Sequence, residues 1–282
     1  MKISIITPCY NAEKYIDETI ESVISQRGNF EIEYIIVDGG SDDKTISIVE
    51  KYKRLINLGQ YSIRCNDVTI TSISEEDSGM YDALVKGLNI VIGDVVAYIN
   101  SDDFYLPNAF STVVEIFKTY PDVEWLTGMP VCYTEKGQIW GCSLPFKYNR
   151  TLIRKGIYGS ILPFIQQEST FWRPKLLSFL DLNRLKGYKF AGDFYTWYMF
   201  SKYVDLYIVK SCLGGFRGRK HQLSSQKNKY FSEFYSIAEK RTFLDIMRAY
   251  LYIVPHYFFP NKIKRLFNKK IIHYYDGQWM KS

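Results

Sequence analysis

The chain lacks the features that mark membrane-spanning, disulfide-framed and zinc-binding proteins. No stretch reaches the roughly 18 consecutive apolar residues that a membrane-spanning helix needs. The five cysteines include no Cys-x-x-Cys pair, so we expect reduced thiols in a cytoplasmic protein. The first residues enter a strand pattern at once, which argues against a signal peptide.

Several catalytic signatures are absent as well. Neither G-x-G-x-x-G after the first strand nor G-x-x-x-x-G-K-[ST] occurs, which argues against dinucleotide-dependent dehydrogenases and P-loop enzymes. No G-x-S-x-G elbow is present. The three histidines, His221, His256 and His273, all lie in the last quarter of the chain, so histidine cannot drive catalysis in the first half.

The positive charge is confined to one end. The net charge is +6 over 282 residues, and residues 241–282 hold eight Lys or Arg against two Asp. The first 240 residues are therefore balanced. This distribution gives no basic surface over the body of the protein, so we expect no nucleic-acid partner.

What the sequence does contain is an alternation of short apolar runs with segments of helical spacing. We expect strands at residues 3–8, 34–37, 68–74 and 94–100, and helices at 15–25, 80–93, 107–122 and through Ile46 and Val49. This order predicts a parallel sheet with right-handed crossovers. Later, a mixed pattern predicts a hairpin around Lys136–Gly137, an extended segment at 163–172, a helix at 193–203, a strand at 205–209 and a helical tail.

Polar residues follow three of the expected strands. They are Thr7–Asn11, Asp38 with two glycines, and the adjacent pair Asp102 and Asp103. Ligands of open parallel sheets bind at the carboxyl ends of the strands, and adjacent carboxylates repel unless a cation lies beside them. Because Mg²⁺ and Mn²⁺ prefer carboxylate, phosphate and water oxygens, the pattern favours a site for a cation and a diphosphate. Each motif alone is equally typical of a turn into a helix N-cap or of a solvated loop.

Four segments in this order resemble the inverting family 2 glycosyltransferases of the GT-A fold. They are SIITPCYNAEKYIDETIESVISQ, EYIIVDGGSDDKT, SEEDSGMYDALVKGLN and GDVVAYINSDDFY. The resemblance implies an α/β fold, with a Rossmann-like, mostly parallel sheet flanked by helices, a mixed acceptor-side half and a C-terminal helical tail. It implies a glycosyltransferase domain at 1–228, divided into a nucleotide-sugar half at 1–104 and an acceptor half at 105–228, and a basic aromatic tail at 229–282.

The resemblance also implies a donor site for a nucleoside diphosphate sugar, with UDP favoured as the nucleotide. The residues expected to contact the donor are Thr7, Pro8, Tyr10, Asp38, Glu75, Asp77 and Asp102. Asp102 and Asp103 would hold Mg²⁺ or Mn²⁺, with Asp103 favoured as the direct ligand. Arg217 and Arg219 lie in a segment that resembles the closing loop of the family, where they would neutralise phosphate.

On the acceptor side, the resemblance points to two segments. Asp193 would be the general base that deprotonates the acceptor hydroxyl, although its position also suits a helix N-cap. Gln166, Gln167 and Glu168 would bond sugar hydroxyls, and Trp172 would offer a stacking face, although a half-buried strand explains this segment equally well.

The tail allows two interpretations. Its aromatic residues and the basic cluster at Lys262, Lys264, Arg265, Lys269 and Lys270 suit a helix on an anionic membrane surface, which would serve a polyprenyl-linked acceptor. A helix packed on the domain with a solvated basic face fits as well.

The function expected from the resemblance is metal-dependent, inverting sugar transfer to a glycan or lipid-linked glycan in bacterial surface polysaccharide synthesis. The alternatives are a nucleotidyltransferase acting on sugar phosphates, and a non-catalytic module that binds nucleotide sugars. A nucleotidyltransferase would normally carry a glycine-rich basic loop after the first strand, which TPCYNAEKY lacks.

Overall fold

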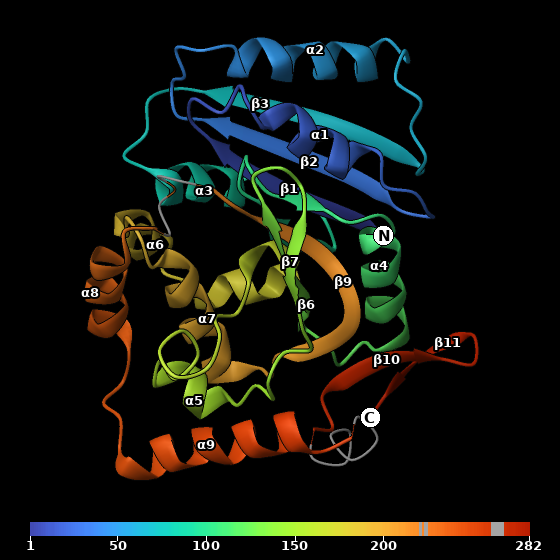
Figure 1. Cartoon of the computed structure of the whole chain (residues 1–282). Coiled ribbons are helices and arrows are strands. Elements are labelled where there is room, and N and C mark those ends of the chain that lie inside the picture. Colours follow the sequence, from blue (N-terminus) through green and yellow to red (C-terminus); the bar gives the residue numbers. More distant parts are fainter. Residues whose placement is uncertain (220–221, 223–224, 261–267) are drawn as a thin grey trace.

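The computed structural model describes residues 1–219, 222, 225–260 and 268–282 of the chain. Over these residues, one sheet of 11 strands runs through the molecule, and helices pack against it (Figure 1). The mixed α/β class expected from the sequence is confirmed.

The first half of the sheet is parallel, as the sequence predicts. Its strands are β1 (Lys2–Cys9), β2 (Glu31–Asp38), β3 (Asp67–Ser74) and β4 (Val95–Tyr98), joined through helices α1 (Ile16–Ile24), α2 (Thr45–Asn57) and α3 (Met80–Leu88). β1 pairs in parallel with β2 and β4, and β2 pairs with β3. Because α3 ends at Leu88, the expected closure of this helix by Gly93 is wrong. Gly93 instead donates its amide to Ser4 Oγ (2.8 Å) at the turn into β4.

The second half mixes helices with antiparallel and parallel strands. Its elements are β5 (Phe104–Tyr105), α4 (Ala109–Thr119), β6 (Trp125–Thr134), β7 (Ile139–Cys142), α5 (Arg150–Arg154), η1 (Gln167–Ser169), β8 (Thr170–Trp172), η2 (Pro174–Phe179), α6 (Leu182–Gly187), α7 (Gly192–Tyr203) and β9 (Tyr207–Gly218). β6 and β7 form the expected hairpin, and Gly137 takes a φ of 80° in its turn. The segment expected to be extended instead makes one 3₁₀ turn, η1, before β8.

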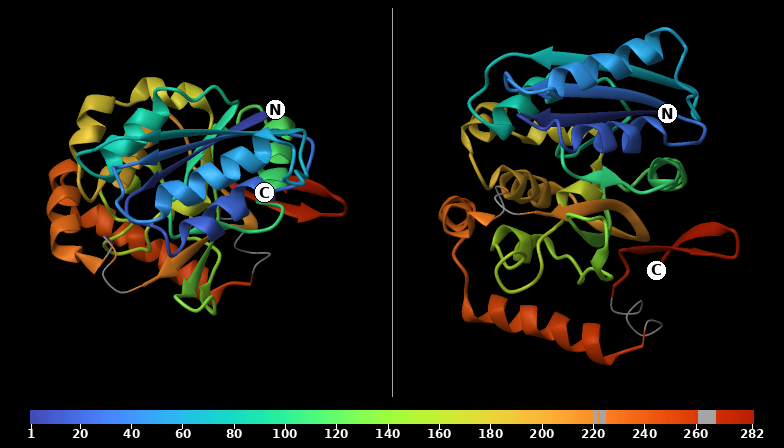
Figure 2. Two further views of the ribbon diagram at one scale, coloured as in Figure 1. Left: turned by 90° about the horizontal axis from the view of Figure 1, so that it is seen from above. Right: turned by 45° about the horizontal axis from the view of Figure 1, so that its top comes forward.

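The sequence predicted a tail that is helical throughout, and this prediction is wrong. It contains α8 (Lys227–Ile237) and α9 (Phe243–Phe258), and then the hairpin β10 (Ile271–Tyr275) and β11 (Gln278–Lys281). β10 pairs in parallel with β9, so the end of the chain extends the main sheet (Figure 2). The boundary expected at residue 228 falls inside α8. The structure therefore does not separate the tail from the domain, because pairing with the exposed edge of β9 satisfies backbone groups of both segments.

The strand order places the parallel half beside the mixed half. Along the sheet the strands run β11-β10-β9-β6-β8-β4-β1-β2-β3, with β5 paired to β9 and β7 to β6. Apolar side chains fill both faces: Ile3 and Ile5 belong to one buried cluster and Ile6 to the other, as the two-residue alternation of a strand requires. The carboxyl ends of β1 and β4 consequently lie on the same side of the sheet as η1, which precedes the antiparallel β8, and as the end of β9.

We predict that Gly214→Ala lowers the free energy of unfolding by about 1–3 kcal/mol, the usual range for overpacking a buried site. A Cβ at Gly214 on β9 would lie 2.1 Å from the carbonyl oxygen of Glu168 in η1, and that backbone atom cannot swing aside. Chemical denaturation measures the difference. Gly187→Ala is the control, because a Cβ there meets nothing within 4 Å. Equal stability of the two variants would show that β9 and η1 are not packed as described.

Candidate active site

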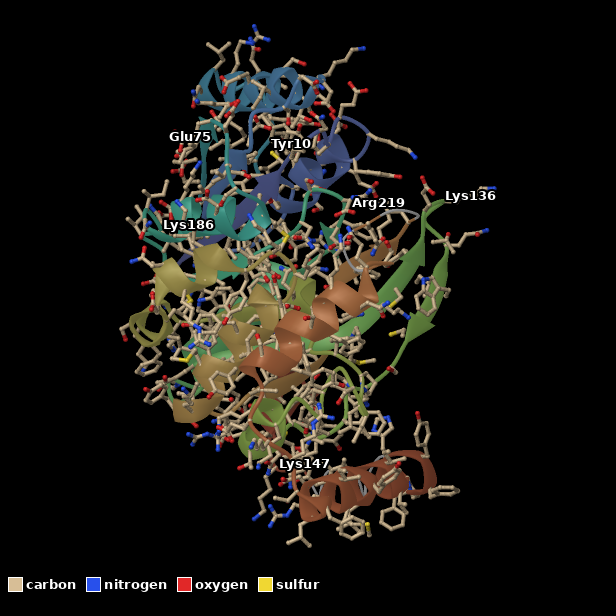
Figure 3. All side chains as sticks on the ribbon, turned by 90° about the vertical axis from the view of Figure 1, so that its left-hand side faces the viewer. Tyr10, Glu75, Lys136, Lys147, Lys186 and Arg219 are labelled. Carbon is tan, nitrogen blue, oxygen red and sulfur yellow. The ribbon has the colours of Figure 1, made fainter. Side chains whose placement is uncertain are left out.

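The polar residues singled out from the sequence do meet at one edge of the sheet. Cys9 at the end of β1 is level with Asp38 at the end of β2, and Asp38 is level with Ser74 on β3. The end of β4 lies beside β1 on the other side, with Tyr98 level with Ile6. Tyr10, Glu75 and Arg219 are labelled in Figure 3, which views the side of the molecule where these strand ends and the end of β9 come together.

Asp38 organises the turn after β2. Its carboxylate is buried and accepts hydrogen bonds from the amides of Gly40 (3.1 Å) and Ser41 (3.0 Å) and from Ser74 Oγ (2.8 Å). The next strand end is thereby tied to the turn. Asp38 holds the loop in shape, whereas Tyr10 beside it leaves 64% of its surface exposed and available to a ligand.

Two residues expected to contact the donor lie inside the sheet instead. Thr7 is fully buried, and its hydroxyl lies 3.0 Å from Tyr34 Oη. Pro8 is also a buried β1 residue. Because near-continuous apolar runs in parallel strands are buried on both faces, these residues support the site from beneath.

Two carboxylates after β3 border the same opening. Asp77 lies over the glycine turn, so that a Cβ on Gly39 would come within 2.5 Å of its Oδ2. Its Oδ1 accepts the amide of Gly79 (2.7 Å), and burial raises the pKa of Asp77 above its usual value. Glu75 is more exposed and pairs with Lys86 at 2.8 Å. Glycine at position 39 is therefore what lets Asp77 approach the loop.

The two adjacent aspartates occupy different environments. Asp103 is only 2% exposed, and its oxygens accept the backbone amide of Arg217 (2.8 Å) and the side-chain amide of Asn100 (3.4 Å). Burial, with the charges of Asp102 and Glu168, raises the pKa of Asp103 well above its usual range. Asp102 is more accessible and forms an ion pair with Arg219. The geometry therefore favours Asp102 over Asp103 as a direct metal ligand, contrary to the expectation from the sequence.

The site fits a divalent cation only in the presence of further ligands. Among the described residues, no group of three or more His, Cys, Asp or Glu side chains is arranged to hold a metal ion. A single accessible carboxylate, Asp102, matches the way Mg²⁺ binds through one or two carboxylates and completes its shell with substrate phosphates and water.

Arg217 and Arg219 lie against this acidic loop. The Arg217 side chain is almost fully buried, donates from Nε to the Asp102 carbonyl (3.0 Å) and pairs with Glu18 on α1 (2.5 Å). Arg219 is more exposed and pairs with the Asp102 side chain. Arg217 is thus a structural cation, and Arg219 is the one placed to exchange its partner for a phosphate.

Asp193 lies in the first turn of α7, where its carboxylate receives several hydrogen bonds. Oδ1 accepts the amide of Phe194 (2.7 Å) and the hydroxyls of Tyr230 (3.4 Å) and Tyr81 (3.5 Å). Burial raises the pKa of Asp193 to about 6, although these hydrogen bonds oppose the rise. The alternative N-cap role is wrong, because Ala191 is the N-cap residue and no side chain caps the helix.

Glu168 is a buried carboxyl group on which the charges of both Asp193 and Asp102 act. It is 3% exposed, and burial with the charges of Asp193 and Asp102 raises its pKa to about 8. Its Oε1 has no hydrogen-bond partner among the described residues. Since Asp193 and Asp102 both act on one side chain, the two halves of the site are within electrostatic range of each other.

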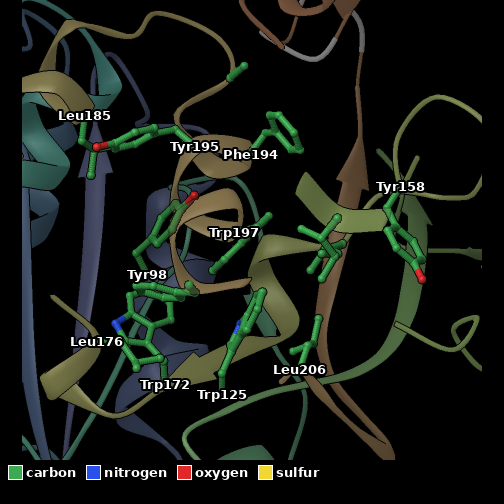
Figure 4. Close-up of a cluster of buried hydrophobic side chains, with 14 of the residues drawn as sticks. Tyr98, Trp125, Tyr158, Trp172, Leu176, Leu185, Phe194, Tyr195, Trp197 and Leu206 are labelled. Carbon is green, nitrogen blue, oxygen red and sulfur yellow. The ribbon is translucent and has the colours of Figure 1, made fainter. Parts of the chain in front are cut away.

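The other acceptor-side candidates differ in their placement. Gln167 donates to the carbonyl of Tyr98 at the end of β4, and Gln166 donates to Cys132 Sγ (3.4 Å). Trp172 is 1% exposed and packs edge-on to Tyr98 and Trp197 (Figure 4). The expected sugar-stacking role of Trp172 is therefore wrong, because the ring belongs to the core.

Sequence reasoning missed Tyr81 and Tyr230, which both reach Asp193. Tyr81 follows the SEED motif at the start of α3, and its approach requires the absence of a side chain at Gly192, where a Cβ would meet the ring at 2.6 Å. Gly192, directly before Asp193, was the feature of the sequence that could have indicated a close approach by another side chain. Tyr230 lies on α8, and nothing in its local sequence links it to residue 193.

Comparison with protein families shows which family the chain belongs to. Residues 4–203 match the sequence model of the family described as glycosyl transferase family 2, which is more than two thirds of the chain. The chain belongs to glycosyl transferase family 2. The resemblance stated from the motifs is therefore confirmed.

Individual curated proteins are similar to this chain. The putative teichuronic acid biosynthesis glycosyltransferase TuaG of Bacillus subtilis is 26% identical over 251 residues, which cover 88% of this chain and 91% of TuaG. Poly(ribitol-phosphate) beta-N-acetylglucosaminyltransferase TarS of Staphylococcus aureus is 33% identical over 105 residues, 37% of this chain and 17% of TarS. A glycosyltransferase of Nostoc is 31% identical over 42% of this chain and 34% of its own length. The matched region thus spans about a third or less of the latter two relatives.

Solved structures share the fold of this family 2 chain. A crystal structure of S. aureus TarS residues 1–349 in complex with UDP-GlcNAc superposes with a TM-score of 0.59 at 18% identity, covering 94% of this chain and 70% of that one. A second, in complex with UDP, gives a TM-score of 0.56 at 20% identity, covering 93% and 73%. The GT-A architecture is confirmed by this similarity.

We predict that Tyr230→Phe raises the pKa of Asp193 and shifts the acid limb of the activity profile upward by as much as about one pH unit. The variant removes a donor that stabilises the carboxylate, and a base works only when it is ionised, so activity is lost at a higher pH as pH falls. The pH dependence of kcat/KM measures the shift.

Tyr235→Phe is the matched control, because Tyr235 lies on the same helix and is 53% exposed. An acid limb that stays in place in Tyr230→Phe, or that moves equally in both variants, would show that Tyr230 does not affect the pKa of Asp193.

Proposed function

We propose that this protein transfers a sugar from a nucleoside diphosphate sugar to a hydroxyl group of a glycan acceptor, with inversion at the anomeric carbon. The observation that carries the proposal is Asp193, a carboxylate with a pKa of about 6 that accepts a hydrogen bond from Tyr81 on α3, the helix that follows β3. A base with this pKa is mostly ionised at neutral pH and still accepts a proton readily.

In the proposed reaction, Asp193 removes the proton of the acceptor hydroxyl while the oxygen attacks the anomeric carbon. The attack comes from the face opposite the diphosphate, and the bond from the anomeric carbon to the diphosphate oxygen breaks with its electron pair leaving on that oxygen. Arg219 lies beside Asp102, where it would balance part of the charge on the leaving group. Bound Mg²⁺ or Mn²⁺, held through Asp102, would supply the remaining electrostatic stabilisation.

The donor in this proposal carries UDP. Support comes from the structures of TarS with UDP-GlcNAc and UDP, which share this fold. Tyr10 offers an exposed ring on which the uracil of UDP could stack. The Asp38 turn, with Glu75 and Asp77, lies at the same edge of the sheet. The name of TuaG, which concerns teichuronic acid biosynthesis, supports an acceptor in a bacterial surface polymer. The acceptor is a glycan, free or carried on a polyprenyl lipid.

We predict that Asp193→Asn reduces kcat about a hundred- to ten-thousandfold and leaves the affinity for UDP unchanged, because the amide keeps the shape but cannot take the proton. Release of UDP in a transfer assay and calorimetry of UDP binding measure the two quantities. Asp122→Asn makes the same chemical change at an exposed surface residue and should be neutral.

A non-catalytic module would bind UDP but show no turnover before the mutation, and a nucleotidyltransferase would release pyrophosphate instead of UDP. Either result contradicts the proposed function. Retained turnover in Asp193→Asn would contradict only the role given to the base.

We predict further that Mn²⁺ tightens UDP binding and that Asp102→Asn removes this effect. The reason is that one accessible carboxylate and the diphosphate would share the ion. Calorimetry with and without Mn²⁺ provides the measurement. Asp205→Asn, which alters a carboxylate paired with Lys270, is the control. If the parent protein binds UDP with the same affinity with and without Mn²⁺, the proposed metal dependence is contradicted.

A further inference from the structure

Helix α9 packs on the domain through a mixed polar and apolar face. Asp245 and Ala249 are buried there, Tyr252 and Ile253 pack against the core beside them, and Asp245 pairs with Lys155 (3.3 Å) on the domain. His256 stacks on Phe146, with ring centroids 3.9 Å apart. Arg241, just before the helix, donates to the carbonyl groups of Lys155 and Gly156 (both 2.6 Å). Polar contacts therefore fix which face of α9 points inward.

The opposite face is apolar and exposed. We call it the outer stripe, and its members are Phe243 (74% exposed), Leu244 (66%), Met247 (44%), Tyr250 (54%), Leu251 (64%), Val254 (50%) and Phe258 (77%). Their spacing of three and four residues places them along one side of the helix. Figure 1 shows α9 along the lower edge of the molecule, and the right-hand view of Figure 2 agrees that no other element lies beneath it.

The charge around the outer stripe has one sign. Asp245 is the only acidic residue between 241 and 260, and it faces inward, paired with Lys155. Lys240 and Arg248 are exposed at and beside the start of the helix. Five more basic residues follow α9 in the sequence, at 262, 264, 265, 269 and 270. An exposed apolar stripe flanked by cations is the chemistry that an anionic bilayer surface accepts.

A bilayer fits this surface better than a second copy of the chain. A two-fold dimer brings identical patches together, so the exposed cations would face one another across the interface. The helix has 16 residues, about 24 Å, and among the described residues no helix is long and apolar enough to cross a membrane. The stripe is therefore suited to lie in the interface.

We propose that α9 docks the protein on an anionic membrane, with the outer stripe inserted among the lipid head groups. The sequence left a helix packed on the domain as an equal alternative; α9 does pack on the domain, and the exposure of the outer stripe supports an additional contact with a membrane. Docking itself is independent of the reaction proposed above.

The docked orientation would also serve a lipid-linked acceptor, and this part rests on the proposed function. A cavity of about 340 Å³ opens beside α9, lined by Phe146, residues 159–164, Ile253 and Tyr257. Phe164 in its wall contacts the ring of Tyr230 (centroids 5.4 Å apart), and Tyr230 bonds Asp193. Apolar surface thus continues from the membrane-facing helix to the residue that tunes the base.

The test is co-sedimentation of the full chain with vesicles. We expect binding to phosphatidylcholine vesicles that contain about 30% phosphatidylglycerol, weaker binding to pure phosphatidylcholine, and weaker binding in about 0.5 M NaCl. The double variant Leu251→Glu, Phe258→Glu should reduce the partition coefficient at least about tenfold, because it places two charges where apolar groups enter the lipid.

The matched control is Leu58→Glu, Ile92→Glu, which adds the same charges at apolar residues that are 61% and 72% exposed in the other half of the molecule. Binding that is absent in the parent, or unchanged in the α9 variant, overturns the proposal. A parent dimer that becomes monomeric in the α9 variant without any vesicle binding overturns it too, in favour of self-association.

Calorimetry of UDP binding separates this proposal from the proposed function. A parent that binds UDP but no vesicles refutes membrane docking alone. A parent that binds vesicles but neither UDP nor any UDP-sugar refutes the proposed function and leaves docking in place.

Discussion

The site depends on holding several carboxylates together in a partly desolvated space. Burial, with the charges of nearby carboxylates, raises the pKa values of Asp103 and Glu168, and Asp102 contributes to both shifts. Arg217 makes this arrangement possible, because its amide binds Asp103, its side chain binds the Asp102 carbonyl and its guanidinium pairs with Glu18. The end of β9 is thereby fastened to the acidic loop and to α1. Removal of such a buried cation would leave uncompensated charge, which is far more costly than loss of an exposed ion pair.

Local sequence patterns predicted the parallel half of the fold well and the rest only in part. The four strands and the convergence of their carboxyl ends follow from continuous apolar runs and from the handedness of crossovers, which are local or general rules. β10 could not be anticipated in this way, since its partner β9 is more than fifty residues away in the sequence. Trp172 was misplaced for a similar reason: an aromatic residue in an extended segment looks the same whether it stacks on a sugar or packs edge-on to Trp197 in the core.

The residues of the candidate site show the same division. Asp38 and Asp102 were singled out because acidic residues after strands carry a local signal, whereas Asp193 was predicted from the family resemblance. Burial, which decides what each carboxylate can do, is a tertiary property, and it separates Asp103 from its neighbour Asp102. The amphipathic pattern of α9 likewise did not reveal which face would be covered. The inward contacts of Asp245 and His256 settle that question.

The strength of the base depends on three separate parts of the chain. Burial raises the pKa of Asp193, and the hydrogen bonds that the carboxylate accepts oppose this rise. The Phe194 amide of α7, Tyr81 of α3 and Tyr230 of α8 each donate to the carboxylate and bring its pKa back to about 6. Since Tyr230 belongs to the C-terminal segment, that segment helps to set the pKa of Asp193. Displacement of α8 would therefore change proton transfer as well as stability.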